Sequence, residues 1–202
     1  MKYVLGICLF LWCFCVSAQK VDSLRLPTRS GIPLLTYLKH EATPRPAVLF
    51  YTTYHQGASD QRILDRLYDR GFAAVLVYAR GIPSDISAYS PYENETEDIH
   101  QIIDWISRQP WSNGSVGMYG GSYTGFAQWA ATKNLHPALK TIVPQVAVMP
   151  GFDTPMENNV PLNLGVYWPH DNIYKKPPFR RSLPFEWFEK GLAFRDLDSL
   201  GG

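Results

Sequence analysis

The sequence has no cysteine after residue 15, because its three cysteines lie near the N-terminus, at positions 8, 13 and 15. Disulfide bonds, a thiol nucleophile and cysteine-based zinc sites are therefore excluded for the rest of the chain. Neither sign of charge predominates, and the net charge of the 202 residues is +1 at pH 7. Binding to nucleic acid or to an anionic membrane surface is therefore not indicated. Histidine and carboxylate clusters with metal-ligand spacing are missing too, so no metal and no cofactor is expected.

The apolar run at the N-terminus is too short to span a membrane. Met1-Lys2 precedes the apolar residues 4–15, and Val16-Ser17-Ala18 offers small residues for cleavage before Gln19. This pattern predicts a signal peptide over residues 1–18, and so an exported protein without stable membrane insertion after cleavage. An N-terminal membrane anchor is the alternative. Export of a mature chain without disulfides favours a bacterial envelope, with a periplasmic or secreted location.

Hydrophobic patterning after residue 19 predicts alternating strands and helices. Residues 21–26 and 32–39 are typical of an antiparallel hairpin at a sheet edge. Further elements are expected in this order: strand 47–51, helix 59–69 capped by Ser59, strand 72–78, helix 94–108, strand 115–119, helix 123–133 and strand 139–148. The order favours an α/β fold, with a mostly parallel sheet and helices on both faces. Residues 150–188 show no strand pattern, and residues 185–200 have a helical one.

The segment Val116–Gly125 joins a predicted strand to a predicted helix through a glycine-flanked serine. Gly120-x-Ser122 matches the first half of the nucleophile elbow of α/β-hydrolases, but the second glycine falls one place late, at Gly125. Gly120 lets the backbone pass close to the serine without a clash. The N–H groups that begin the helix would face the oxygen that becomes negative during acyl transfer. From these residues alone, an ordinary strand-to-helix turn is the alternative.

Placement at strand ends favours the catalytic interpretation of Ser122. Tyr54, Arg80 and Ser122 each follow the C-terminal end of a predicted strand. Sites in open parallel sheets lie at that edge.

Four segments resemble the Xaa-Pro dipeptidyl-peptidase and cocaine esterase family of serine hydrolases. They are residues 90–95 (SPYENE), 104–106 (DWI), 109–114 (QPWSNG) and 116–125 (VGMYGGSYTG). The family, which includes α-amino-acid ester hydrolases and glutaryl acylases, also places the second glycine late. Its fold is an α/β-hydrolase domain with an inserted helical cap and a C-terminal jelly roll. The resemblance implies that residues 19–150 form the N-terminal part of the hydrolase domain and that residues 151–202 begin the cap.

The resemblance also implies roles for three residues. Ser122 would be the nucleophile, and the backbone N–H of Tyr123 and the hydroxyl of Tyr54 would form the oxyanion hole. A phenol can donate to a developing oxyanion, and losing one such donor costs about 10²–10³ in rate. A half-buried loop tyrosine is the alternative for Tyr54. The family has Asp-x-Arg-Gly where this chain has Tyr78-Ala79-Arg80-Gly81, so Arg80 is expected to brace loops and not to contact substrate.

The residues after Ser122 offer no convincing general base. The chain order in α/β-hydrolases is serine, acid, histidine. Asp153 and His170 have that order, but no later strand positions His170, and His136 leads into a strand at the wrong edge of the sheet. The triad acid and histidine are therefore expected to lie outside this chain, together with most of the cap and the jelly roll. As a fragment, the chain would fold poorly and have little activity.

Asp153 and Glu157 are weaker candidates, for substrate binding. In the amino-ester hydrolase branch of the family, a carboxylate cluster holds the substrate's ammonium group, and one member follows the strand after the nucleophile helix. Solvated loop charges are the alternative.

The expected function is that of an exported serine hydrolase, cleaving an ester or amide of a small molecule or peptide through an acyl-enzyme on Ser122. A proline-specific dipeptidyl peptidase and a non-catalytic binding protein with this fold are the alternatives, and the oligomeric state is left open.

Overall fold

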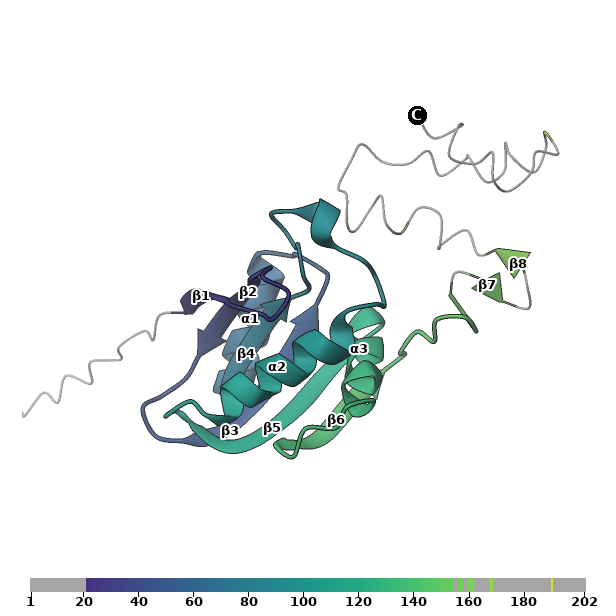
Figure 1. The fold of residues 1–202 in the computed structure, drawn as a ribbon. Helices are drawn as coiled ribbons and strands as arrows, with labels where there is room; N and C mark the ends of the chain where they lie inside the picture. Colours follow the sequence, from purple (N-terminus) through teal and green to yellow (C-terminus); the bar gives the residue numbers. More distant parts are fainter. Residues whose placement is uncertain (1–20, 155, 158–159, 162–167, 169–189, 191–202) are drawn as a thin grey trace, which may run out of the picture.

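The described part of the chain forms a sheet of six strands with three α-helices packed against it (Figure 1). The computed structural model describes residues 21–154, 156–157, 160–161, 168 and 190. The elements within these residues are β1 (Asp22–Leu26), β2 (Leu34–Lys39), β3 (Arg45–Thr52), α1 (Ala58–Tyr68), β4 (Ala73–Tyr78), the short 3₁₀ helix η1 (Ile86–Ala88), α2 (Glu95–Ser107), β5 (Ser112–Gly121), α3 (Tyr123–Thr132), β6 (Leu139–Gln145), β7 (Met156–Glu157) and β8 (Val160–Pro161).

The strand order of the large sheet is β1-β2-β4-β3-β5-β6, and the sheet is mixed. The pairs β3–β4, β3–β5 and β5–β6 are parallel, whereas β1–β2 and β2–β4 are antiparallel. The predicted antiparallel hairpin at the sheet edge is thus confirmed. Because β3 and β5 run in the same direction, the loops that follow them emerge at the same edge of the sheet.

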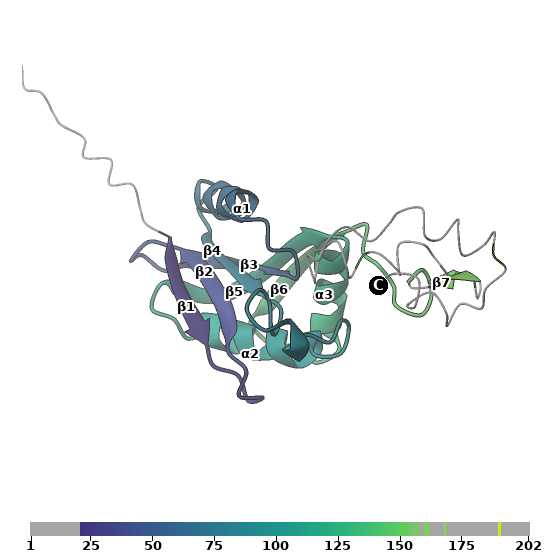
Figure 2. The same cartoon turned by 90° about the horizontal axis from the view of Figure 1, so that it is seen from above.

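Helices cover both faces of this sheet, as the sequence predicts. Helix α1 lies on one face, and α2 and α3 lie together on the other (Figures 1 and 2). Strand β4 is buried along its whole length. The predicted apolar stripe of α2 is also buried, and it consists of Ile99, Ile102, Ile103 and Ile106. Apolar burial of this kind is the dominant favourable term in folding, so these contacts hold the site-bearing elements in place.

Some predicted boundaries are wrong. Gly57, not Ser59, caps α1, because its positive φ of 57° lets the chain turn sharply and begin the helix at Ala58. β5 starts three residues earlier than predicted and β6 ends three residues earlier. β7 and β8 form a hairpin of two residues per strand within a segment expected to lack strands. The sequence did not predict it, because strands this short leave no periodicity.

Several predictions fall on residues outside the described part of the chain. They are the signal peptide over residues 1–18, the candidate base His170 and, apart from Lys190, the helix at 185–200. Among the residues that the structure does describe, no helix combines the length and the apolar character needed to cross a membrane.

Candidate active site

Ser122 occupies a sharp turn between β5 and α3. Its backbone angles are φ 56° and ψ −125°, in a region that residues with a Cβ rarely adopt. The turn is fixed on both sides: the Ser122 N–H donates to the carbonyl of Gln145 on β6, at 2.9 Å. The Ser122 carbonyl accepts from the N–H groups of Gly125 and Phe126, at 2.9 and 3.0 Å. The surroundings therefore hold the strained conformation that presents the Ser122 side chain at the strand end.

The two glycines that flank this turn are required by close contacts. A Cβ on Gly120 would lie 2.3 Å from the Thr124 hydroxyl oxygen. A Cβ on Gly125 would lie 2.9 Å from both the Ala147 Cβ and the Gln145 carbonyl oxygen. At Gly125, α3 thus lies close to the end of β6 and to the residues just after it, which accounts for the late position of the second glycine.

The structure brings the predicted oxyanion donors to Ser122. The Tyr54 hydroxyl, on the loop after β3, lies 3.2 Å from the Ser122 Oγ. The loop is held where it leaves the strand, because the Tyr54 N–H donates to the Thr52 hydroxyl at 2.9 Å. Tyr123 is the first residue of α3, so its N–H has no intrahelical acceptor and is free to serve a ligand. The Ser122 hydroxyl, the Tyr54 hydroxyl and the Tyr123 N–H together form the core of a candidate site for acyl transfer.

A small cavity of about 50 Å³ opens next to Ser122. Its walls are mostly aromatic, and the lining residues are Tyr54, Tyr92, Ser122, Tyr123, Val148, Thr154 and Trp168. The Trp168 ring stacks on Tyr123 with centroids 5.8 Å apart and meets Tyr54 edge-on at 6.2 Å. A larger cavity of about 500 Å³ lies elsewhere, between α1 and strands β3, β5 and β6, and none of the three predicted catalytic residues lines it.

Behind the cavity, the Tyr123 side chain enters a buried polar cluster that the sequence did not reveal. Its hydroxyl donates to the carboxylate of Glu95, and it accepts from the Tyr92 N–H at 3.2 Å. Glu95 is the first residue of α2 and is only 2% exposed. Burial raises the pKa of Glu95 and raises that of the Tyr123 hydroxyl well above its usual range. A signal did exist, since Glu95 continues the buried face of α2 one turn before Ile99.

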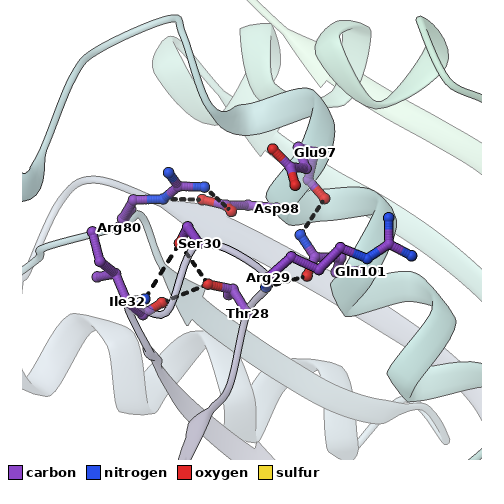
Figure 3. Close-up of polar contacts among 8 residues, drawn as sticks. All are labelled: Thr28, Arg29, Ser30, Ile32, Arg80, Glu97, Asp98 and Gln101. Atoms are coloured by element: carbon purple, nitrogen blue, oxygen red, sulfur yellow. Dashed lines mark hydrogen bonds and ion pairs between the residues drawn. The ribbon is translucent and has the colours of Figure 1, made fainter.

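Arg80, expected to brace loops, joins the loop after β4 to α2. It pairs with the fully buried Asp98 of α2 through two contacts, at 2.6 and 3.3 Å (Figure 3). Figure 3 also shows the loop before β2 against the same helix, where the Arg29 N–H donates to the Gln101 side chain at 2.8 Å. These contacts tie α2 to two loops, the one after β4 and the one before β2.

The weaker candidates remain predictions. The Asp153 carboxylate closes a turn by accepting from the Met149 N–H at 2.7 Å, and its neighbour Thr154 lines the cavity. Burial raises the pKa of Tyr92 to about 12, and the charge of Asp153 adds to this shift, so Asp153 lies within electrostatic reach of the cavity. For Glu157 the structure describes the backbone in β7 and not the side chain.

None of the described residues that line the cavity is a histidine. His136 precedes β6, at the sheet edge opposite Ser122, and lies 3.5 Å from Asp104. The position of His136 therefore agrees with the expectation that it is not the base. Within the described residues there is also no group of three or more histidine, cysteine, aspartate or glutamate side chains arranged to hold a metal ion.

The fold and the turn together define an α/β-hydrolase: parallel central strands, helices on both faces, and a serine in a strained turn between strand and helix. A more specific assignment follows from the sequence match. The model of the X-Pro dipeptidyl-peptidase (S15) family matches residues 22–183, so the chain belongs to that family. The resemblance found in the sequence is thus confirmed.

Known relatives of the chain are hydrolases of several kinds. The cocaine esterase of Rhodococcus sp. (strain MB1 Bresler) is 29% identical over 134 residues, covering 62% of this chain and 23% of that protein. The Xaa-Pro dipeptidyl-peptidase of Lactobacillus helveticus (strain DPC 4571) is 28% identical over 137 residues, 60% of this chain and 17% of that protein. A solved structure of an α-amino acid ester hydrolase superposes with a TM-score of 0.59 at 28% identity, covering 67% of this chain and 26% of the other. The chain therefore matches about a quarter or less of each relative.

Proposed function

We propose that Ser122 is the nucleophile of a serine hydrolase that cleaves an ester or amide bond through an acyl-enzyme. The observation that carries this proposal is the turn itself. A serine with a φ of 56° stands between β5 and α3, with a tyrosine hydroxyl 3.2 Å from its Oγ and the first N–H of a helix one residue on. Strain of this kind persists where the surrounding structure imposes it, and it concentrates at functional sites.

Each part of this arrangement has a task in acyl transfer. The Ser122 Oγ attacks the carbonyl carbon, and the carbonyl oxygen becomes an oxyanion. The Tyr123 N–H and the Tyr54 hydroxyl donate to that oxyanion, aided by the positive end of the α3 dipole. The tetrahedral intermediate then collapses to the acyl-enzyme and releases the alcohol or amine. Water hydrolyses the acyl-enzyme in a second, equivalent step.

The proton of the Ser122 hydroxyl must pass to a base, and the leaving group must receive a proton. A serine is a weak nucleophile at neutral pH without such a partner. Because no histidine is among the described residues that line the cavity, the proposal requires a base from residues other than these.

Export by the segment 1–18, to a periplasmic or secreted location, is part of the same proposal and rests on the sequence pattern alone.

The substrate class is proposed from the relatives and the cavity. The relatives' names include esterases and proline-specific peptidases, so either an ester or an amide is consistent with them. The aromatic walls around Ser122 favour an apolar acyl group, because most of the surface that they present to the cavity is apolar. An ester or amide with an apolar acyl part, in a small molecule or a peptide, is therefore the proposed substrate.

Labelling with a fluorophosphonate probe tests this proposal. A version of the protein that includes the general base should form a covalent adduct at Ser122, and Ser122→Ala should form none. Ser115→Ala, in the same strand, is the matched control and should label like the unaltered chain. Hydrolysis of p-nitrophenyl esters and of Xaa-Pro p-nitroanilides would then separate an esterase from a dipeptidyl peptidase. A folded chain that takes no label would support a binding protein that retains the fold.

A further inference from the structure

We propose that Glu95 and the Tyr123 hydroxyl act as a positioning pair that fixes the Tyr123 backbone N–H in the oxyanion site. This inference rests on the proposed acyl transfer at Ser122. It concerns side-chain atoms on the far side of Tyr123 from the reacting groups. Neither Glu95 nor the Tyr123 hydroxyl is proposed to touch the substrate.

The first support is that Tyr123 serves the site and the buried cluster at once. Its N–H belongs to the turn that holds Ser122, whereas its side chain is 1% exposed and lies behind the cavity. The ring is enclosed by other aromatic rings, whose centroids lie 5.0 Å (Tyr92), 5.7 Å (Phe126), 5.8 Å (Trp168) and 6.4 Å (Tyr89) away. Ring packing limits sideways movement, but a hydrogen bond at the hydroxyl end also fixes how far the ring reaches into the cluster.

The second support is the identity of the acceptor. A carboxyl group at 2% exposure is expensive to bury unless hydrogen bonds compensate for lost water. Leucine or isoleucine would fill this position on the buried face of α2 without that cost. Glu95 instead accepts from Tyr123, and its place in the first turn of α2 lets the helix dipole favour a negative charge there. The retained carboxyl therefore acts as an oriented acceptor.

The third support is that α2 is anchored to its surroundings. The Arg80–Asp98 pair holds its buried side, and the Arg29–Gln101 hydrogen bond holds its more exposed side (Figure 3). The Thr96 hydroxyl also donates to the carbonyl of Ala130 at 3.0 Å, which joins α2 to α3. A hydrogen bond to Glu95 is therefore a bond to a fixed point.

The Tyr123 hydroxyl also fixes a second wall of the cavity. It accepts from the Tyr92 N–H, and Tyr92 has a positive φ of 70°, which a residue with a Cβ rarely adopts. Loss of the hydroxyl would release Tyr92 as well as the Tyr123 ring. Because both residues line the cavity next to Ser122, the pair links the helix end to the shape of the site.

Four variants test the pair in a version of the protein that includes the general base, with kcat and KM for a p-nitrophenyl ester and the rate of fluorophosphonate labelling as readouts. We expect Tyr123→Phe and Glu95→Leu each to lower kcat about tenfold with KM within about twofold, a fraction of the effect of removing an oxyanion donor outright. The double variant should lose about as much as Tyr123→Phe alone and not a hundredfold, since the bond that Glu95→Leu breaks is already lost in Tyr123→Phe. Glu95→Gln keeps an acceptor oxygen and should recover most of the rate that Glu95→Leu loses.

Tyr68→Phe is the matched control. Tyr68 also donates its hydroxyl to a glutamate, Glu41, at 3.1 Å, but this pair lies near the N-terminal end of β3. It should leave kcat unchanged within about twofold. Folded Tyr123→Phe and Glu95→Leu variants that keep the rate, or losses that multiply in the double variant, would overturn the inference. If the unaltered chain neither labels nor turns over, the proposed function fails first and the pair falls with it.

Discussion

Two turns in this chain have nearly the same backbone conformation but differ in the residue that adopts it. Gly57, between β3 and α1, has φ 57° and ψ −107°, and Ser122, between β5 and α3, has φ 56° and ψ −125°. Both residues precede a helix that follows a parallel strand. Gly57 is exposed, and a Cβ there would meet nothing within 4 Å. The chain therefore uses glycine where the geometry alone is needed and accepts strain where a side chain must be presented.

Removing the side chain of Ser122 should give the largest effect. If the strain serves to present a nucleophile, Ser122→Ala should lower kcat/KM by at least about 10³-fold, because the variant lacks the hydroxyl proposed to form the acyl-enzyme. Steady-state hydrolysis of a p-nitrophenyl ester measures this change. Gly57→Ala serves as the comparison and should retain activity in proportion to the folded fraction. Equal losses of kcat/KM in both variants would mean that the Ser122 turn has no catalytic role that the Gly57 turn lacks.

Removing one hydroxyl next to Ser122 should give the second largest effect. Tyr54→Phe keeps the ring and its edge-on contact with Trp168 but deletes the group that lies 3.2 Å from the Ser122 Oγ. We expect kcat to fall by about 10²–10³ with little change in KM, since an oxyanion donor acts mainly in the transition state. Tyr37→Phe, in β2, provides a control tyrosine away from the cavity. An unchanged kcat would remove Tyr54 from the oxyanion site.

The contrast between these turns also shows how much the sequence predicts. The strand, the serine and the helix after it could be located, because glycines on either side mark a sharp turn and the flanking residues have clear periodicity. The α1 start was misplaced at Ser59, because a capping side chain is an easier signal to recognise than a glycine with positive φ. The antiparallel pairing of β1 with β2 at the sheet edge could be predicted because two short strand-like segments lie close together in the sequence.

The periodicity of α2 indicates that Glu95 is buried, but local pattern could not predict that it contacts Tyr123. Glu95 and Tyr123 are 28 residues apart in sequence, and only the packing of α2 against α3 brings them together. A charged residue at the start of an amphipathic helix is usually exposed, so the SPYENE segment by itself does not point to a buried Glu95. The nearness of Tyr54 to Ser122 followed from the family resemblance and not from periodicity, since loop conformations carry no such signal.

A third prediction concerns the close approach of α3 to the chain after β6. Gly125→Ala should lower the free energy of unfolding by about 1–3 kcal/mol, because the new Cβ would meet backbone at 2.9 Å and overpack the contact. Gly57→Ala meets no neighbouring atom and should cost about 1 kcal/mol through its positive φ alone. Urea unfolding of both variants measures the difference. A smaller effect at Gly125 than at Gly57 would contradict the packing explanation for the late glycine.

Exchanging the residues of the two turns should give the smallest and most direct effect. Ser122→Gly relieves a strained residue, which typically costs about 1–3 kcal/mol, but it also loosens the unfolded chain by up to about 1 kcal/mol. The net gain in the free energy of unfolding should therefore be about 1 kcal/mol, accompanied by the loss of labelling. Gly57→Ser should have the opposite sign and a similar size. Thermal unfolding followed by circular dichroism can resolve shifts of this size. If Ser122→Gly destabilises the chain instead, the serine makes stabilising contacts that outweigh its strain, and its conformation would then need no functional reason.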